Sequence, residues 1–414
     1  MNGPWLRLPD GPGYRKAKRV ANVAVKRGGG ALNKAFAFRE LGQCMGEAAR
    51  APGDRGGGPR RAPDEQRTFA ALDLGTNNCR LLIATPTARG FRIVDAYSRI
   101  VRLGEGLSQT GRLSPDAMER AMSALRICAD KIQRRGATKI RAIATQACRS
   151  AENGPEFVEQ VEARTGLRLS IITPREEAQL SVAGCLNLLD RDAEAALVLD
   201  VGGGSTELSW IDLSDRGLDV DPRHMAHWRL PIKAWLSIPI GVVTLAERFP
   251  EGERVEEGWF RAMVDAVKAR IEEFPHAEPM RRLFETGRAH MVGTSGAITS
   301  LAGLHLGLQR YDRNIVDGLW MDRSECEVAV NRLLGLTAAE RAQEPCIGAD
   351  RADLVLAGAA ILQAVQELWP CSRVRVADRG LREGLLMSLM SDQQRRPRRR
   401  RRGGASKSKP VSDE

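Results

Sequence analysis

Short apolar runs alternate with amphipathic segments along the central part of the chain. Residues 68–75 and 79–86 are apolar runs on either side of a small polar turn, which predicts a hairpin of buried strands that 91–104 extends. Residues 114–136 carry apolar side chains at helical spacing, with Ser114 as the N-cap and Gly136 as the end. The same patterns predict further strands at 139–145, 169–173 and 195–212, and helices at 154–166 and 175–189.

The opening of this pattern occurs twice. "AALDLGTNNCRLLI" at 70–83 and "LVLDVGGGSTEL" at 197–208 each run from an apolar strand through Asp-x-Gly into a second strand. Their aspartates, Asp73 and Asp200, are 127 positions apart. Internal similarity of this kind predicts two related α/β halves that face each other across a cleft.

The length of the chain agrees with two halves. A chain of 414 residues is too long for one hydrophobic core, so two domains are expected. We predict that the first domain covers 68–176 and is completed by 381–391, and that the second covers 177–380.

The net charge of +11 is concentrated at the two ends of the chain. Residues 1–67 hold 14 Lys and Arg against 6 acids, residues 391–414 hold 9 against 3, and the remainder carries −3. Gly, Pro and charge dominate both ends, which predicts disordered tails at 1–67 and 392–414. The Arg-rich C-terminal tail suits contact with a polyanion, or else it is a solvated tail without a dedicated partner. Part of 1–67 is alternatively an upstream start-site artefact.

The cysteines and the hydropathy pattern exclude several classes of protein. Neither a membrane span nor a secretory signal is predicted, because no window approaches 18 uncharged apolar residues and the N-terminus lacks an apolar h-region. The cysteines show no CxxC pair and no His at ligand spacing, which argues against a zinc site or a disulfide framework and favours a cytoplasmic location. They are Cys44, Cys79, Cys128, Cys148, Cys185, Cys326, Cys346 and Cys371.

Three glycine-containing turns are suited to binding phosphate. Backbone N–H groups can converge on a phosphate where no Cβ intervenes, and neighbouring hydroxyl and amide side chains add donors. The third turn, in "HMVGTSGAITSLAG", follows a predicted strand and opens a helix at Ala297, which suits an anion or a nucleotide. For each turn taken singly, a tight hairpin or a plain strand-to-helix turn is the alternative. The predicted phosphate-binding residues are Gly75, Thr76, Asn77, Asn78, Gly202, Gly203, Gly204, Ser205, Thr206, Gly293, Ser295 and Gly296.

Carboxylates stand beside the first two turns. Asp73 and Asp200 end their predicted strands, and Glu207 follows the second turn. An acid next to bound phosphate is unfavourable without a cation, and Mg²⁺ binds one or two carboxylates together with water and phosphate oxygens. We therefore predict a Mg²⁺ site formed by these three acids, the alternative being that each Asp caps its own hairpin.

Together the three turns resemble the two phosphate loops and the adenosine loop of the actin/hexokinase/Hsp70 superfamily. Four further segments resemble motifs of the exopolyphosphatase/guanosine pentaphosphate phosphohydrolase family and follow one another in the same order as in that family. They are "ATQACRSAENG", "TPREEAQL", "GADRADLVLAG" and "VADRGLREGLL". The resemblance covers about 68–391. It implies an α/β fold of two actin-like (ribonuclease H-like) domains with the substrate in the interdomain cleft, and it implies a homodimer.

The resemblance also assigns roles to single residues. Glu177, the second acid of "PREEAQ", matches the family's catalytic glutamate, which activates the attacking water. Arg149 in "ACRSA" matches an arginine that faces the substrate. Asp73, Asp200 and Glu207 match the acids associated with Mg²⁺. Without the resemblance, Glu177 would be interpreted as an acid at a solvated helix start and Arg149 as a surface residue.

The expected function is Mg²⁺-dependent hydrolysis of a terminal phosphoanhydride, with inorganic polyphosphate or guanosine pentaphosphate as the substrate. The first turn departs from the family's Asp-x-Gly-Ser-Asn-Ser pattern at Thr76 and Asn78, which leaves the substrate preference open. A sugar-kinase-like phosphotransferase and a non-catalytic sensor of polyphosphate or alarmone are the alternatives. Arg351 and Asp353 are expected to form a structural ion pair rather than to take part in chemistry.

Overall fold

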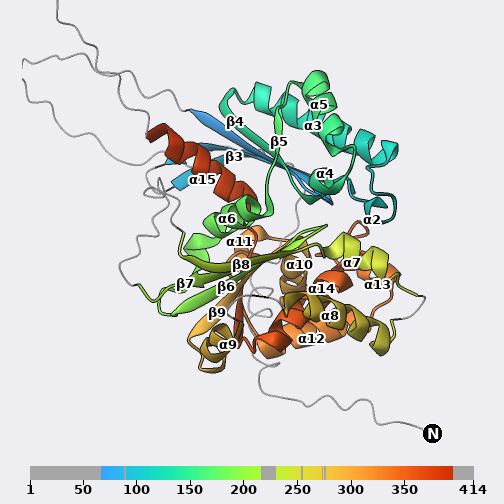
Figure 1. Ribbon diagram of the computed structural model, residues 1–414, viewed down its shortest axis with the longest axis vertical. Coiled ribbons are helices and arrows are strands. Elements are labelled where there is room, and N and C mark those ends of the chain that lie inside the picture. Colours follow the sequence, from blue (N-terminus) through green and yellow to red (C-terminus); the bar gives the residue numbers. More distant parts are fainter. Residues whose placement is uncertain are drawn as a thin grey trace, which may run out of the picture. The chain divides into compact units, whose positions relative to one another are not determined.

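Two mixed sheets form the framework of the protein. A computed structural model describes residues 67–87, 90–215, 230–252, 255–272, 274 and 277–394 (Figure 1). The first sheet has the strand order β3-β2-β1-β4-β5, and the second has the order β10-β11-β9-β6-β7-β8. The strands of the first sheet are β1 (Thr68–Leu74), β2 (Asn78–Thr87), β3 (Gly90–Ile100), β4 (Ala137–Ala144) and β5 (Leu169–Ile171). Those of the second are β6 (Ala195–Val201), β7 (Thr206–Asp212), β8 (Ile232–Ile238), β9 (Ala289–Thr294), β10 (Trp320–Asp322) and β11 (Arg373–Ala377).

The two sheets are built alike. In the first sheet, β1, β2 and β3 form an antiparallel meander, while β4 and then β5 run parallel to β1 on its other side. In the second sheet, β6, β7 and β8 form the corresponding meander, while β9 and then β11 run parallel to β6 on its other side. The repeated opening of the sequence thus corresponds to a repeated sheet, and the prediction of two related α/β halves is confirmed.

Helices cover both sheets. Helix α3 (Pro115–Arg134) begins as predicted, because the Ser114 side chain accepts a hydrogen bond from the Ala117 N–H at 3.3 Å, and it is followed by Gly136 at a φ of 59°. The other helices of the first half are α2 (Leu107–Thr110), α4 (Gln146–Ser150) and α5 (Gly154–Thr165). Those of the second half are α7 (Val242–Arg248), α8 (Glu257–Ile271), α9 (Ala277–Glu285), α10 (Gly296–His305), α11 (Arg313–Val316), α12 (Arg323–Leu334), α13 (Ala338–Gln343) and α14 (Val355–Leu368). The almost wholly apolar α14 packs against α8 and α10 in the core of this half.

Two further helices, α6 (Pro174–Cys185) and α15 (Leu381–Gln394), lie side by side (Figure 1). Both pack on the first sheet through a shared apolar cluster. Their approach requires glycine, because a Cβ at Gly184 would lie 1.9 Å from the carbonyl oxygen of Gly380. Helix α6 also packs on the second sheet, so the domain boundary predicted between residues 176 and 177 falls inside a helix that serves both halves.

Several predictions concern residues outside the described ranges. The described residues do not include 1–66 and 395–414, so the disorder of the tails and the polyanion contact of the Arg-rich tail stay predictions, as does the homodimer. Helix α15 continues through Gln394, which corrects the predicted tail start at residue 392. Within the part of the chain that is described, no helix combines the length and the apolar character needed to cross a membrane. The seven cysteines found there are free.

Candidate active site

The two glycine-containing hairpins have the same backbone design. The β1–β2 turn is closed by the Gly75 N–H, which donates to the carbonyl oxygen of Asn78 at 2.9 Å. The β6–β7 turn is closed by the Gly202 N–H, which donates to the carbonyl oxygen of Ser205 at 2.9 Å. Each hairpin therefore presents a four-residue turn directly after an Asp-bearing strand.

The two turns contact each other. A Cβ at Gly203 would lie 3.0 Å from the Asn77 nitrogen and 3.0 Å from the Thr76 Cβ. A Cβ at Gly204 would lie 2.7 Å from the Thr76 Oγ1. Glycine at these positions lets the backbones of the two halves meet. The prediction that both turns border one cleft is therefore confirmed.

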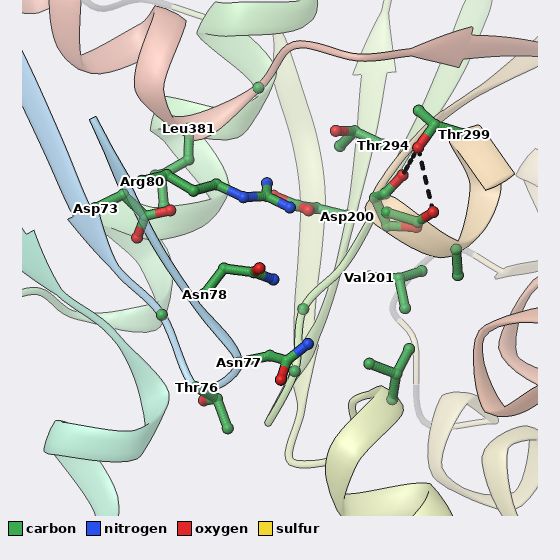
Figure 2. A pocket seen from close by; sticks show the side chains of 18 of the residues that line it. Asp73, Thr76, Asn77, Asn78, Arg80, Asp200, Val201, Thr294, Thr299 and Leu381 are labelled. Carbon is green, nitrogen blue, oxygen red and sulfur yellow. Dashed lines mark hydrogen bonds between the residues drawn. The ribbon is translucent and has the colours of Figure 1, made fainter. Parts of the chain in front are cut away.

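A pocket with a cavity volume of about 190 Å³ opens where the turns meet (Figure 2). Most of the predicted site residues line it, namely Asp73, Gly75, Thr76, Asn77, Asn78, Glu177, Asp200, Gly202, Gly203, Gly204, Ser205, Glu207, Ser295 and Gly296. Residues that sequence reasoning did not select for the site complete the lining, among them Arg80, Thr145, Gln146, Tyr311, Arg351, Arg379, Arg382 and Glu383. Two polar atoms of the first turn, Thr76 Oγ1 and Asn77 Oδ1, are buried without a hydrogen-bond partner.

Three predicted residues lie elsewhere. The Thr206 hydroxyl donates to the carbonyl oxygen of Ile240 at 2.7 Å and is buried on the opposite face of β7, so it is not available to phosphate. Gly293 lies within β9, where a Cβ would meet the Ile298 side chain at 2.7 Å, so its role is close packing and not phosphate binding. Arg149 lines a neighbouring pocket rather than the main one, although it contacts Glu177.

The local fold distinguishes Glu177 from its neighbour Glu176. Thr173 caps the start of α6 by accepting a hydrogen bond from the Glu176 N–H at 3.2 Å. Glu176 pairs with Arg141 outside the pocket, whereas Glu177 faces the pocket with only 10% of its side chain exposed. Arg149 Nη1 donates to Glu177 Oε2 at 3.1 Å and so fixes the direction of the carboxylate.

Burial controls the protonation of Glu177. Its pKa is raised well above its usual range, first by desolvation and then by the nearby Glu207 carboxylate, while the Arg149 guanidinium opposes the shift. A carboxylate with a raised pKa is a stronger base than a solvated one, which suits it to accept a proton from water.

Burial also disfavours the ionised form of the three acids beside the turns. Burial raises the pKa of Asp73 to about 6, although Arg80 and Arg382 oppose the shift. Burial raises the pKa of Asp200, and burial together with the Asp200 charge raises the pKa of Glu207 to about 7. Negative charge has thus been gathered in a desolvated site.

This donor set fits a divalent cation. Asp73 Oδ1 is buried without a hydrogen-bond partner, and the raised pKa values show that a nearby positive charge would be favourable. Among the described residues, no three His, Cys, Asp or Glu side chains converge closely enough to hold a metal ion by themselves. Mg²⁺ needs no such cage, because it retains water and takes phosphate oxygens as ligands.

Arginines that sequence reasoning did not select also enter the pocket. Arg80 extends from β2 toward Asp200, as Figure 2 shows, and Arg382 contributes from α15. Strand alternation could have identified Arg80, because it lies two residues after Asn78 on the same strand face. The predicted pair of Arg351 with Asp353 is wrong: Arg102 Nη1 pairs with Asp353 Oδ2 at 2.8 Å, and Arg351 lines the pocket.

The third turn forms the far wall of the pocket. Ser295 caps α10 by accepting a hydrogen bond from the Ile298 N–H at 3.0 Å, and Gly296 begins the helix. Both residues line the pocket, so the turn lies where sequence analysis expects it.

Comparisons with known proteins agree with this geometry. The sequence profile of the Ppx/GppA phosphatase family matches residues 82–393. Exopolyphosphatase 2 of Mycobacterium tuberculosis is 29% identical over 333 residues, which are 77% of this chain and 98% of that protein. The guanosine-5'-triphosphate,3'-diphosphate pyrophosphatase of Aeromonas hydrophila is 30% identical over 325 residues, which are 78% of this chain and 60% of that protein.

Solved structures show the same fold. An exopolyphosphatase-like protein with 30% identity matches with a TM-score of 0.67, over 78% of this chain and 97% of that one. The Ppx/GppA family member of Aquifex aeolicus, at 26% identity, matches with a TM-score of 0.64 over 79% of this chain and 98% of that one. The predicted α/β fold of two actin-like domains is therefore confirmed.

Proposed function

Because this chain belongs to the Ppx/GppA phosphatase family, we propose that it hydrolyses the terminal phosphoanhydride bond of a polyphosphorylated substrate and releases inorganic phosphate. The observation that carries this proposal is the placement of Glu177. Its buried carboxylate faces a pocket bordered by both glycine-containing turns, and its direction is fixed by Arg149.

Inorganic polyphosphate and guanosine pentaphosphate are the proposed substrates. The relatives described above are named for one or the other. Both molecules end in a phosphoanhydride, so the same pocket chemistry serves either. Arg80 and Arg382 line the pocket and offer guanidinium groups to phosphate oxygens, whereas Arg379 is already paired with Asp317.

The proposed reaction is an attack by water on the terminal phosphorus. Glu177 accepts the proton of the attacking water, the bond between the terminal phosphorus and the bridging oxygen breaks, and the shortened chain departs. The amides of the two turns hold the phosphate oxygens, and Arg149 orients Glu177. Carboxylates from among Asp73, Asp200 and Glu207 would hold Mg²⁺ together with water and phosphate oxygens, and the bound ion would neutralise phosphate charge.

The test measures phosphate release from polyphosphate and from guanosine pentaphosphate, with Mg²⁺ and with a chelator. We expect release that depends on the metal. Binding without release would instead favour a sensor, and ATP consumption that depends on a sugar would favour a kinase. Either result would replace the proposal.

A pair of neighbouring variants tests the catalytic base. Glu177→Gln keeps the shape of the side chain but cannot accept a proton, so turnover should fall by about 10²–10⁴-fold while substrate affinity is kept. Glu176→Gln is the matched control, since Glu176 pairs with Arg141 outside the pocket, and it should remain active. An active Glu177→Gln enzyme would remove this residue from the mechanism.

A further inference from the structure

Residues 101–104, which follow β3, donate backbone N–H groups to the carbonyl oxygens of the first turn. The Asn77 carbonyl oxygen accepts from the N–H groups of Val101 at 2.8 Å and Arg102 at 3.1 Å, and the Thr76 carbonyl oxygen accepts from the Gly104 N–H at 2.9 Å. In a trans peptide the C=O and N–H groups point in opposite directions. These bonds therefore turn the amides of Asn77 and of the next residue away from the segment.

The second turn is bound in the same way by the start of α7. The Gly202 carbonyl oxygen accepts from the Val242 N–H at 3.0 Å, and the Gly203 carbonyl oxygen accepts from the Val243 N–H at 2.8 Å. The amides of Gly203 and Gly204 consequently point away from α7. We call residues 101–104 and 241–243 the carbonyl caps.

Each carbonyl cap contains a glycine at its closest contact. A Cβ at Gly104 would lie 2.3 Å from the Thr76 Cγ2, and a Cβ at Gly241 would lie 2.4 Å from the carbonyl carbon of Gly203. Both glycines follow the last strand of their antiparallel meander, Gly104 after β3 and Gly241 after β8. The repeat that relates the two halves thus extends beyond the hairpins to the segments that support them.

The two carbonyl caps are joined to each other by Glu247 of α7. Glu247 Oε1 accepts from the Gly106 N–H at 2.8 Å, and Glu247 Oε2 accepts from the Ser108 hydroxyl at 2.6 Å. Gly106 and Ser108 lie two and four residues after the first carbonyl cap, while Glu247 lies one turn of helix beyond the second. Hydrogen bonds to a charged acceptor are stronger than neutral ones.

A second connection runs from the first carbonyl cap to another part of the second half. Arg102 pairs with Asp353 through two contacts, Nη1 to Oδ2 at 2.8 Å and Nη2 to Oδ1 at 3.2 Å. Asp353 lies just before α14 and not in the second carbonyl cap, so this pair does not join the two carbonyl caps. Glu247 does join them, and it does not line the substrate pocket.

We propose that Glu247 is a positioning residue that locks the two carbonyl caps together, so that the amides of both turns converge on the same substrate phosphates. This inference rests on the proposed function, in which the turns bind phosphate. When the contacts of Glu247 are lost, Glu177 and the acids stay in place, but the amides of the two turns can move apart. The loss then weakens substrate binding more than it slows the chemical step.

The kinetic test compares Glu247→Ala, Glu247→Gln and the matched surface variant Glu278→Ala, with tripolyphosphate as substrate. Glu278 pairs with Arg282 on the exposed face of α9. We expect Glu247→Ala to raise KM about tenfold or more with a smaller change in kcat, because two charge-assisted bonds are lost. Glu247→Gln should fall between it and the wild type, since one acceptor oxygen remains, and Glu278→Ala should match the wild type.

A double-variant cycle identifies the partner. Ser108→Ala should raise KM less than Glu247→Ala does, and adding it to Glu247→Ala should have no further effect, because both remove the same contact. Fully additive losses would show that Glu247 acts elsewhere and would overturn the proposal.

Hydrogen exchange tests the lock without turnover. In the free protein, the amides of 75–78 and 202–205 should exchange faster in Glu247→Ala than in the wild type or in Glu278→Ala. If the wild type releases no phosphate, the proposed function fails while this measurement still decides the role of Glu247. Unchanged exchange together with an unchanged KM would overturn the lock, whatever happens to Tm.

Discussion

The two hairpins have the same backbone arrangement but carry opposite charges at the equivalent position that faces the aspartate next to the turn. Asp73 is paired across β1 and β2 with Arg80, whereas Asp200 is paired across β6 and β7 with Glu207. The first hairpin therefore presents an acid with a base, and the second presents two acids. Arg80 lowers the pKa of Asp73 against the effect of burial, while Asp200 raises the pKa of Glu207 further.

Because of this difference, the two hairpins suit different ligands although their backbones are alike. The second hairpin concentrates negative charge, so it is the better place for a cation. The first supplies a positive side chain, so it is the better place for a phosphate oxygen. A repeated backbone thus places two oppositely charged side chains, Arg80 and Glu207, in the lining of one pocket.

The largest expected effect comes from removing the second acid of the second hairpin. Glu207→Gln should lower kcat about a hundredfold or more, because metal-assisted charge stabilisation is worth several kcal/mol. Titration with Mg²⁺ should show that the variant needs a higher metal concentration. A variant with normal kcat and normal Mg²⁺ dependence would contradict the placement of the cation at the second hairpin.

The same substitution should stabilise the protein. Because the folded pKa of Glu207 is raised to about 7 from an ordinary value of 4.5, the folded state holds more protons than the unfolded chain between these values, and stability falls as pH rises through this window. In chelator, the free energy of unfolding of Glu207→Gln should exceed that of the wild type by up to about 3 kcal/mol at pH 8. This difference in the free energy of unfolding should vanish below about pH 4. A variant that is less stable than the wild type at pH 8 would contradict the predicted direction.

Arg80, the basic residue of the first hairpin, should affect substrate binding more than the chemical step. Arg80→Gln should raise KM about tenfold through the loss of a charge-assisted contact to phosphate. Arg80→Lys keeps the charge but not the planar fork, so it should recover part of the loss. Equal falls in kcat for both variants, with KM unchanged, would place Arg80 in the chemical step instead.

The smallest effect concerns the third strand of each sheet, where serine occupies the equivalent position in both halves. Ser98 pairs with Arg80 and Ser237 pairs with Glu207, but only the Ser237 hydroxyl is observed to donate to its neighbour, at 2.8 Å to Glu207 Oε1. Ser237→Ala should raise the pKa of Glu207 further and move the acidic limb of the kcat profile to higher pH. Ser98→Ala serves as its control and should leave that profile in place.

Local patterns predict the hairpins well because each needs few residues. An apolar strand, an Asp-x-Gly turn and a second strand are defined within about ten positions, and strand alternation assigns their faces. Alternation also explains the error at Thr206: Ser205 and Glu207 face the pocket, so the residue between them faces the core. Gly293 was misplaced because a glycine required for packing looks the same in sequence as a glycine required for phosphate.

The rest of the pocket depends on contacts that no local pattern reports. Arg382 and Glu383 line the pocket from α15, about 300 positions after the first turn. The pair of Arg102 with Asp353 joins residues 251 positions apart. Such contacts follow from the packing of whole elements, which is why the expected pair within "GADRADLVLAG" was wrong.

The packing of α15 also determines when the first half can finish folding. Leu385 and Leu386 belong to the same apolar cluster as Phe69 and Ala71, although the entire second half separates them along the chain. During synthesis this cluster stays incomplete, covered only in part by Leu180 of α6, until residues 381–394 have been translated. The apolar surface left exposed in that interval is of the kind that chaperones shield during synthesis.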